Sequence, residues 1–201
     1  MDETLDIREL IKYPYQDNLK TLYNHLGRYY YAMKKLNITK DDEVLDIACG
    51  RGYGAYLLSQ HAKTVFGSDI NAEYLKFAEA NFQTKNIIYL YPENGKATIP
   101  STVNKIVCIE TIEHMKENDI IEFLDTLTNA CGPNAQLFMT FPVGKNMPSE
   151  YNPYHKCEPS VEFIRNIMKK SFARTDYEIN RYVNNYNQLT EYCVMVCKEK
   201  I

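Results

Sequence analysis

The chain has 201 residues, 45% of them hydrophobic and 24% charged, which is the composition of an ordinary globular protein. Its net charge of −3 at pH 7 gives no electrostatic reason to bind nucleic acid, and no lysine and arginine block forms a phosphate-binding stripe. No apolar run approaches the roughly 18 residues that a membrane-spanning helix needs, so membrane insertion is not expected.

The acidic start of the chain, Met1 to Asp6, lacks the apolar core of a signal peptide, so a cytoplasmic location is expected. The six cysteines include no C-x-x-C pair and are interpreted as small buried thiols in a reducing compartment. His155 and Cys157 have no clear second pair of ligands, and no metal is expected. The length predicts a single domain over residues 1–201, and the sequence carries no signal for its oligomeric state.

The first 40 residues are expected to form helices over residues 5–12 and 17–36. A break falls at Pro14 because proline disfavours a helical residue before it. From residue 43 onward a different pattern begins, in which short apolar runs alternate with amphipathic stretches. The expected strands span residues 43–48, 64–68, 87–91, 105–109 and 136–141, and the expected helices span residues 54–62, 72–82, 118–131 and 160–171.

Two further extended runs, residues 175–183 and 191–198, are joined by the polar loop 184–188 and are expected to form an antiparallel hairpin. Together with the earlier alternation, this predicts an α/β fold. We expect a Rossmann-like three-layer sandwich with a seven-stranded, mostly parallel sheet that ends in the hairpin. Ligands of such sheets bind at the carboxyl ends of the strands, near the switch in strand order.

Three glycines lie between the first expected strand and the first expected helix of this core. Gly50, Gly52 and Gly54 allow positive φ and let the backbone approach a ligand closely. Asp69 ends the next strand, where a carboxylate can accept hydrogen bonds from both hydroxyls of an adenosyl ribose. The glycine spacing also satisfies the dinucleotide fingerprint G-x-G-x-x-G/A, so NAD and S-adenosylmethionine compete on this pattern alone.

Two acidic residues favour S-adenosylmethionine over NAD. Asp46 precedes the glycines, where it would repel a pyrophosphate but attract the ammonium and sulfonium groups of a methionine moiety. Glu93 follows the third strand, where an acid can contact the adenine amino group. The alternative for Asp46 is that it only caps the glycine turn.

Several segments resemble motifs of the class I S-adenosylmethionine-dependent methyltransferases. Residues 44–54, V-L-D-I-A-C-G-R-G-Y-G, are similar to motif I, and residues 65–70 resemble the segment that follows it. Residues 109–115 resemble the E-x-x-E-H segment after strand four, and residues 136–142 resemble strand five. The chain departs from the pattern at strand four, where Lys105 replaces an aspartate.

Two more segments resemble a branch of this family that acts on small molecules and glycans. Residues 151–155 are similar to an N-P-[YF]-H element, and residues 25–29 are similar to an H-x-x-R-Y segment before the core. The resemblance implies that the helices of residues 1–40 form a lid over the cofactor, with Arg28 paired to the methionine carboxylate. Residues 41–201 would then be the Rossmann-like core.

The expected cofactor is therefore S-adenosylmethionine. The residues expected to bind it are Arg28, Asp46, Ala48, Cys49, Gly50, Gly52, Tyr53, Gly54, Asp69, Ile70, Glu93, Asn94, Ile109 and Glu110. Strand three ends in Pro92, Glu93 and Asn94 rather than in the usual Gly-Asp, which weakens the pattern there.

Methyl transfer from a sulfonium is an in-line displacement with a neutral leaving group, so it needs alignment and, for a hydroxyl or ammonium acceptor, a base. His114 and His155 are the candidate bases because histidine titrates near neutral pH. Glu113 is expected to hold His114 or to contact the acceptor. The alternative is that both histidines only stabilise loops.

The expected partner is a small-molecule methyl acceptor, preferably a sugar, a nucleotide-sugar or another glycan precursor. This preference follows from the resemblance to the N-P-Y-H branch. Quinone, lipid or secondary-metabolite acceptors are the next alternative, and a non-catalytic S-adenosylmethionine-binding regulatory module is another. No nucleic-acid partner is expected.

Overall fold

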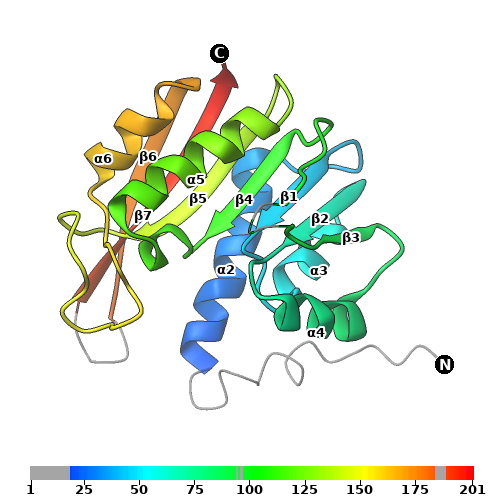
Figure 1. The fold of residues 1–201 in the computed structure, drawn as a ribbon, viewed down its shortest axis with the longest axis horizontal. Coiled ribbons are helices and arrows are strands. Elements are labelled where there is room, and N and C mark those ends of the chain that lie inside the picture. The colour runs from blue at the N-terminus through cyan, green and yellow to red at the C-terminus, as the bar shows by residue number, and fades with distance from the viewer. Residues whose placement is uncertain (1–18, 94, 96, 184–188) are drawn as a thin grey trace. The chain divides into compact units, whose positions relative to one another are not determined.

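The computed structural model of the chain describes residues 19–93, 95, 97–183 and 189–201. The helix expected over residues 5–12 and the loop 184–188 lie outside the described residues. The chain divides into two compact units, Met1–Ala97 and Thr98–Ile201 (Figure 1). The single domain, with its division at residue 40, stays a prediction.

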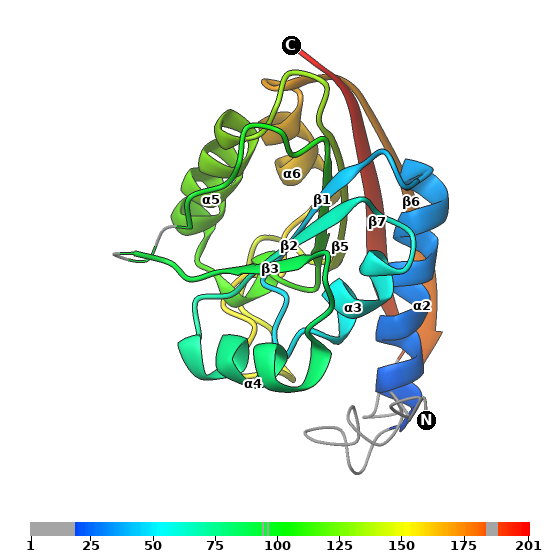
Figure 2. The same cartoon turned by 90° about the vertical axis from the view of Figure 1, so that its right-hand side faces the viewer.

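The described residues of the first unit form three parallel strands and three helices. Its described elements are α2 (Leu19–Leu36), β1 (Glu43–Ile47), α3 (Tyr53–Ser59), β2 (Thr64–Ser68), α4 (Ala72–Phe82) and β3 (Ile87–Leu90). The strands lie in the order β3-β2-β1, and α3 contacts all three of them as well as α2 and α4 (Figure 2). Val44 and Leu45 are fully buried in β1, as expected for a parallel strand that is covered on both faces.

The second unit combines a parallel strand pair with an antiparallel hairpin. Its elements are β4 (Lys105–Ile109), the 3₁₀ turn η1 (Ile112–His114), α5 (Glu117–Ala130), β5 (Gln136–Pro142), α6 (Val161–Met168), β6 (Phe172–Val183) and β7 (Leu189–Lys200). The strands lie in the order β4-β5-β7-β6, with β4 and β5 parallel and β7 antiparallel to both β5 and β6. Helix α5 packs against α6, and α6 packs against β6 (Figures 1 and 2).

The predicted fold class is confirmed, because the strands are mostly parallel and the chain ends in an antiparallel hairpin. The hairpin strands are longer than expected, since their pairing extends from Phe172 opposite Lys200 to Val183 opposite Leu189. Helix α6 ends at Met168, three residues before the expected end at residue 171. Across the described part of the chain, none of the helices combines the length and the apolarity required to cross a membrane.

Candidate active site

The loop after β1 is a tight backbone turn fixed to the end of β2. Ala48, Gly50 and Gly52 all have positive φ, at 57°, 55° and 89°. A non-glycine residue such as Ala48 keeps this conformation only where its surroundings enforce it, at a cost of about 1–3 kcal/mol. The N–H of Cys49 donates to the carbonyl of Ser68 at 2.9 Å, which fixes the turn.

The three glycines of this loop face different surroundings. A Cβ atom on Gly50 would meet nothing within 4 Å, so the loop is open at that point. A Cβ atom on Gly52 would lie 2.5 Å from Cβ of Ala78 and 2.6 Å from the hydroxyl of Tyr89, and one on Gly54 would overlap the Tyr29 ring. Close packing therefore supports the loop at Gly52 and Gly54, while the Gly50 position leaves room for a ligand to approach the backbone.

Replacing Gly54 with alanine is expected to destabilise the chain by about 1–3 kcal/mol, because the new methyl group must displace the buried Tyr29 ring. Gly27→Ala is the control, since Gly27 lies in α2 with open space around its Cα. That control should be neutral or stabilise the chain by up to about 1 kcal/mol. Urea unfolding measures both variants, and an unchanged free energy of unfolding for Gly54→Ala would contradict the packing at this position.

Asp46 is a fully buried acid on β1. The Tyr29 hydroxyl donates to its Oδ1 at 3.1 Å, and the N–H of Ala55 also donates to the carboxyl group. Burial raises the pKa of Asp46 to about 8, although these two hydrogen bonds oppose the increase. These hydrogen bonds fit a residue that caps the turn. The raised pKa fits a carboxyl group that becomes fully charged only when a cation lies beside it.

Asp69 follows β2 and is fixed by two backbone donors. Its Oδ2 accepts from the N–H of Gly50 at 2.9 Å, and its Oδ1 accepts from the N–H of Asn71 at 2.8 Å. Each carboxylate oxygen can accept a further hydrogen bond. This arrangement fits the expected contact with two ribose hydroxyls, and the contact itself stays a prediction.

The other expected cofactor residues of the first unit differ in their exposure. Arg28 is buried in α2, whereas Ile70 and Glu93 are exposed. The Tyr53 hydroxyl lies 3.3 Å from Nδ1 of His25, and its ring meets the Tyr29 ring edge-on. The expected site residue Asn94 lies outside the described residues.

In the second unit, the end of β4 is joined to β5 through Glu110. This residue has a φ of 48°, again a positive value at the end of a parallel strand. Its N–H donates to the carbonyl of Thr140 at 3.0 Å, and its Oε1 accepts from the Thr140 hydroxyl at 2.8 Å. The side chain thus fixes the strand end, which is compatible with the expected backbone role of Ile109 and Glu110 beside the cofactor.

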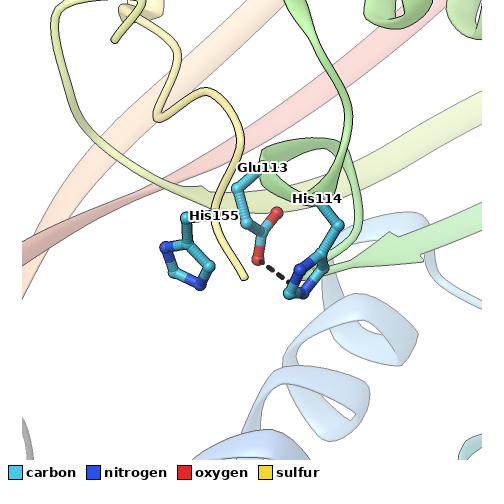
Figure 3. Close-up of side chains that lie close together, drawn as sticks. All are labelled: Glu113, His114 and His155. Carbon is cyan, nitrogen blue, oxygen red and sulfur yellow. Dashed lines mark ion pairs between the residues drawn. The ribbon is translucent and has the colours of Figure 1, made fainter. Parts of the chain in front are cut away.

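The second unit also brings the three expected catalytic residues together (Figure 3). Glu113 and His114 belong to η1, and His155 belongs to the loop after β5. The carbonyl of Glu113 accepts from the N–H groups of Lys156, at 2.7 Å, and Cys157, at 3.2 Å, so the main chain joins the two segments. The histidine ring centroids lie 5.3 Å apart, and Nε2 of His114 lies 4.0 Å from Oε1 of Glu113.

Hydrogen bonds orient both histidine rings in the same way. Nδ1 of His114 lies 3.1 Å from the carbonyl oxygen of Tyr154, and Nδ1 of His155 lies 2.9 Å from Oε1 of Glu158. A carbonyl oxygen can only accept, so Nδ1 of His114 carries the proton and its Nε2 keeps the lone pair. The bond to His155 also lowers the pKa of Glu158, and an ionised carboxylate likewise requires a proton on Nδ1 of His155.

The electrostatic surroundings keep His114 neutral. Its pKa is lowered, mainly because partial burial disfavours the imidazolium form. A neutral imidazole with its lone pair on Nε2 can accept a proton. Glu158 is a part of this arrangement that the sequence did not indicate, because an H-x-x-E spacing places two side chains together only if the loop folds appropriately.

Two sequence comparisons match part of the chain. Residues 44–134 match the family model described as a methyltransferase domain. A probable cobalt-precorrin-6B C(15)-methyltransferase (decarboxylating) of Methanobrevibacter smithii is 26% identical over 101 residues, which cover 49% of this chain and 54% of that protein. The match thus spans about half the length of this curated relative.

Solved structures match most of the chain. The N-methyltransferase NodS from Bradyrhizobium japonicum, in complex with S-adenosyl-L-homocysteine, is 11% identical with a TM-score of 0.70, covering 91% of this chain and 89% of that one. A SAM-dependent methyltransferase from Methanosarcina mazei is 14% identical with a TM-score of 0.66, covering 83% of this chain and 96% of that one. At these identities the likeness establishes the fold. That fold is the one of class I methyltransferases, and residues 44–134 of the chain are similar to a methyltransferase domain.

Proposed function

We propose that the chain transfers the methyl group of S-adenosylmethionine to an oxygen or nitrogen atom of a small molecule. The observation that carries this proposal is the cluster of Glu113, His114 and His155, in which both rings are oriented by bonds at Nδ1. S-adenosylmethionine supplies an electrophilic methyl carbon with a neutral leaving group. The protein then has to orient the acceptor and to accept its proton.

In this proposal the first unit binds the methyl donor. The open backbone at Gly50 lies against the donor, and Asp69 accepts hydrogen bonds from its ribose hydroxyls. Asp46 stabilises the positive charge of the methionine moiety, directly or through water. Arg28 binds the methionine carboxylate, and Glu93 contacts the adenine amino group.

The histidines of the second unit act on the acceptor. His114 is the first candidate for the base, because its side chain is 49% exposed and its pKa is lowered. His155 is 16% exposed, and Glu158 holds its ring. Glu113 is buried behind His114 and orients it or the acceptor.

We further propose that the acceptor is a sugar, a nucleotide-sugar or a related glycan precursor. Tyr151 and Tyr154 are 56% and 73% exposed on the loop that carries His155, so two aromatic side chains of this loop are available to bind a ring. Such loops on a fixed scaffold commonly carry substrate specificity. The N-P-Y-H element of residues 152–155 supports the same class of acceptor.

The proposal is tested by incubating the chain with methyl-labelled S-adenosylmethionine and separate pools of sugars and nucleotide-sugars, amines, quinols and tetrapyrroles. Mass spectrometry and NMR then identify the methylated atom. Label on an oxygen or nitrogen of a sugar derivative supports the whole proposal, and label on an amine or a quinol oxygen refutes only the sugar class. Label on carbon, as the name of the M. smithii relative would suggest for that protein, contradicts it.

Asp69→Ala is expected to weaken S-adenosylmethionine binding by about 10- to 100-fold, because charge-assisted hydrogen bonds to the carboxylate contribute about 1.5–3 kcal/mol. Isothermal titration calorimetry measures this change. Asp119→Ala is the control, since Asp119 is an exposed acid in the first turn of α5. Unchanged binding by Asp69→Ala would remove the ribose assignment.

A further inference from the structure

We propose that Glu113, His114 and His155 bind one divalent transition-metal ion, and that the methyl acceptor binds to this ion. The metal site stands on the geometry of the second unit alone. Its role toward an acceptor rests on the proposed function.

The three side chains are arranged closely enough to share an ion (Figure 3). Each offers one ligand atom, and these atoms all lie within 4.8 Å of one another. A cation with bonds of about 2.1 Å places opposite ligands about 4.2 Å apart and adjacent ligands about 3 Å apart. Ligand atoms that lie up to 4.8 Å apart therefore have to move closer together to bind one ion.

The second observation is the hydrogen bonding around the histidines. Metal-binding histidines almost always donate their other ring N–H to a carboxylate or a backbone carbonyl, which orients the ring and makes it a better ligand. His155 has the carboxylate of Glu158 in this position, at 2.9 Å, and His114 has the carbonyl of Tyr154, at 3.1 Å. Both rings therefore direct their proton away from Nε2, the nitrogen left for a metal.

The backbone also holds the two ligand-bearing segments together. The carbonyl of Glu113 accepts from the N–H groups of Lys156 and Cys157, directly after His155. The Glu113 side chain is 1% exposed, so its carboxylate has little freedom to move. A site that is ordered before its ligand arrives loses less conformational entropy on binding.

The ligand set indicates which ions fit. Two imidazoles and one carboxylate suit manganese, iron, cobalt or zinc, whereas magnesium and calcium prefer oxygen ligands. Three protein ligands leave coordination positions open, as in catalytic metal sites. Because the His114 side chain is 49% exposed, an acceptor can reach those positions.

The ion would serve the reaction by lowering the pKa of the acceptor hydroxyl, whose proton leaves to solvent. The acceptor oxygen then bonds to the methyl carbon, the carbon–sulfur bond breaks, and its electron pair stays on sulfur. This assigns Glu113, His114 and His155 as metal ligands and Glu158 as a positioning residue for His155. With an ion bound, Nε2 of His114 holds the metal and no longer accepts the proton of the acceptor.

The test is a titration of the full chain, free of any histidine tag and stripped with chelator, with cobalt(II) chloride. Calorimetry gives the stoichiometry, and the visible absorption of cobalt(II) reports nitrogen coordination. We expect one ion per chain, with binding weakened more than about tenfold in His114→Ala and His155→Ala, and about 10- to 100-fold in Glu158→Gln. Glu113→Gln, which keeps the side-chain size, is expected to weaken binding as well.

His61→Ala is the matched control, because His61 is an exposed histidine outside the cluster. The metal proposal is overturned if cobalt does not bind stoichiometrically, if His61→Ala weakens binding as much as His155→Ala does, or if the double variant of His114 and His155 still binds normally. Circular dichroism of each variant separates lost binding from lost folding. Unchanged methyl transfer by the stripped chain would contradict the metal's role and leave the proposed function intact. Stoichiometric cobalt binding without methylation of any acceptor would support the metal site and contradict the proposed function.

Discussion

Asp46→Asn is expected to stabilise the chain at neutral pH, and the gain should grow as the pH rises from about 4 to about 8. The carboxyl group of Asp46 has an ordinary pKa of 3.8 and a pKa of about 8 in the folded chain, mainly because it is fully buried. Between these values the folded state holds a proton that the unfolded state has released. The free energy of unfolding therefore falls with rising pH over this window and levels off above it.

The size of the effect follows from the shift. At pH 7 this difference in proton binding lowers the free energy of unfolding of the unchanged chain by at most about 4 kcal/mol, a cost that asparagine avoids. The variant loses about 1–3 kcal/mol of this gain if the N–H₂ group of asparagine finds no acceptor. A net stabilisation of about 1–3 kcal/mol is expected. Tyr29 and Asp69 are the neighbouring groups that influence this titration, the first by donating a hydrogen bond and the second through its charge.

Urea unfolding of the chain and of Asp46→Asn between pH 4 and pH 9 tests this expectation, with Asp119→Asn as the exposed control. Two parallel pH profiles would show that Asp46 is charged throughout and would contradict its raised pKa. The same variant separates the two roles of Asp46. If Asp46 pairs with the charged methionine moiety, S-adenosylmethionine binding weakens about tenfold, whereas a residue that only caps the turn leaves binding unchanged.

Changing both His114 and His155 to alanine is expected to lower kcat by about 10²- to 10⁴-fold, because the acceptor loses its base or the groups that hold it. The affinity for S-adenosylmethionine should stay the same. Steady-state kinetics and calorimetry on the single and double variants measure the two quantities. Normal turnover in the double variant would mean that both histidines only stabilise loops, and His61→Ala controls for the loss of an exposed imidazole.

The sequence predicted the elements whose pattern is local. The largely apolar runs at residues 64–68 and 105–109 are strands with the expected bounds, since a parallel strand covered on both faces is apolar along most of its length. The bounds of the hairpin were less accurate. Cross-strand pairing extends β6 and β7 beyond their apolar centres, and such pairing depends on the partner strand rather than on local composition.

The candidate site was predictable to the level of residue types but not of contacts. The E-x-x-E-H and N-P-Y-H elements pointed to Glu113, His114 and His155, which the second unit does bring together. The hydrogen bond that Nδ1 of His155 donates to Glu158 depends on how the loop after β5 folds, and no spacing rule for helices or strands applies there.

In the first unit, the sequence pointed to Arg28 as a site residue but gave no sign of the contacts that the neighbouring Tyr29 makes. The Tyr29 hydroxyl binds Asp46 and its ring fills the space beside Gly54. A tyrosine in an aromatic-rich helix gives no signal of such a partner, because the pairing depends on tertiary packing.

The central claim is that the glycine loop binds S-adenosylmethionine rather than a dinucleotide. Calorimetric titration of the chain with S-adenosylmethionine and with NAD, under the same conditions, tests it most directly. We expect one S-adenosylmethionine to bind per chain, with no heat of binding from NAD. Tight binding of NAD without binding of S-adenosylmethionine would contradict the account.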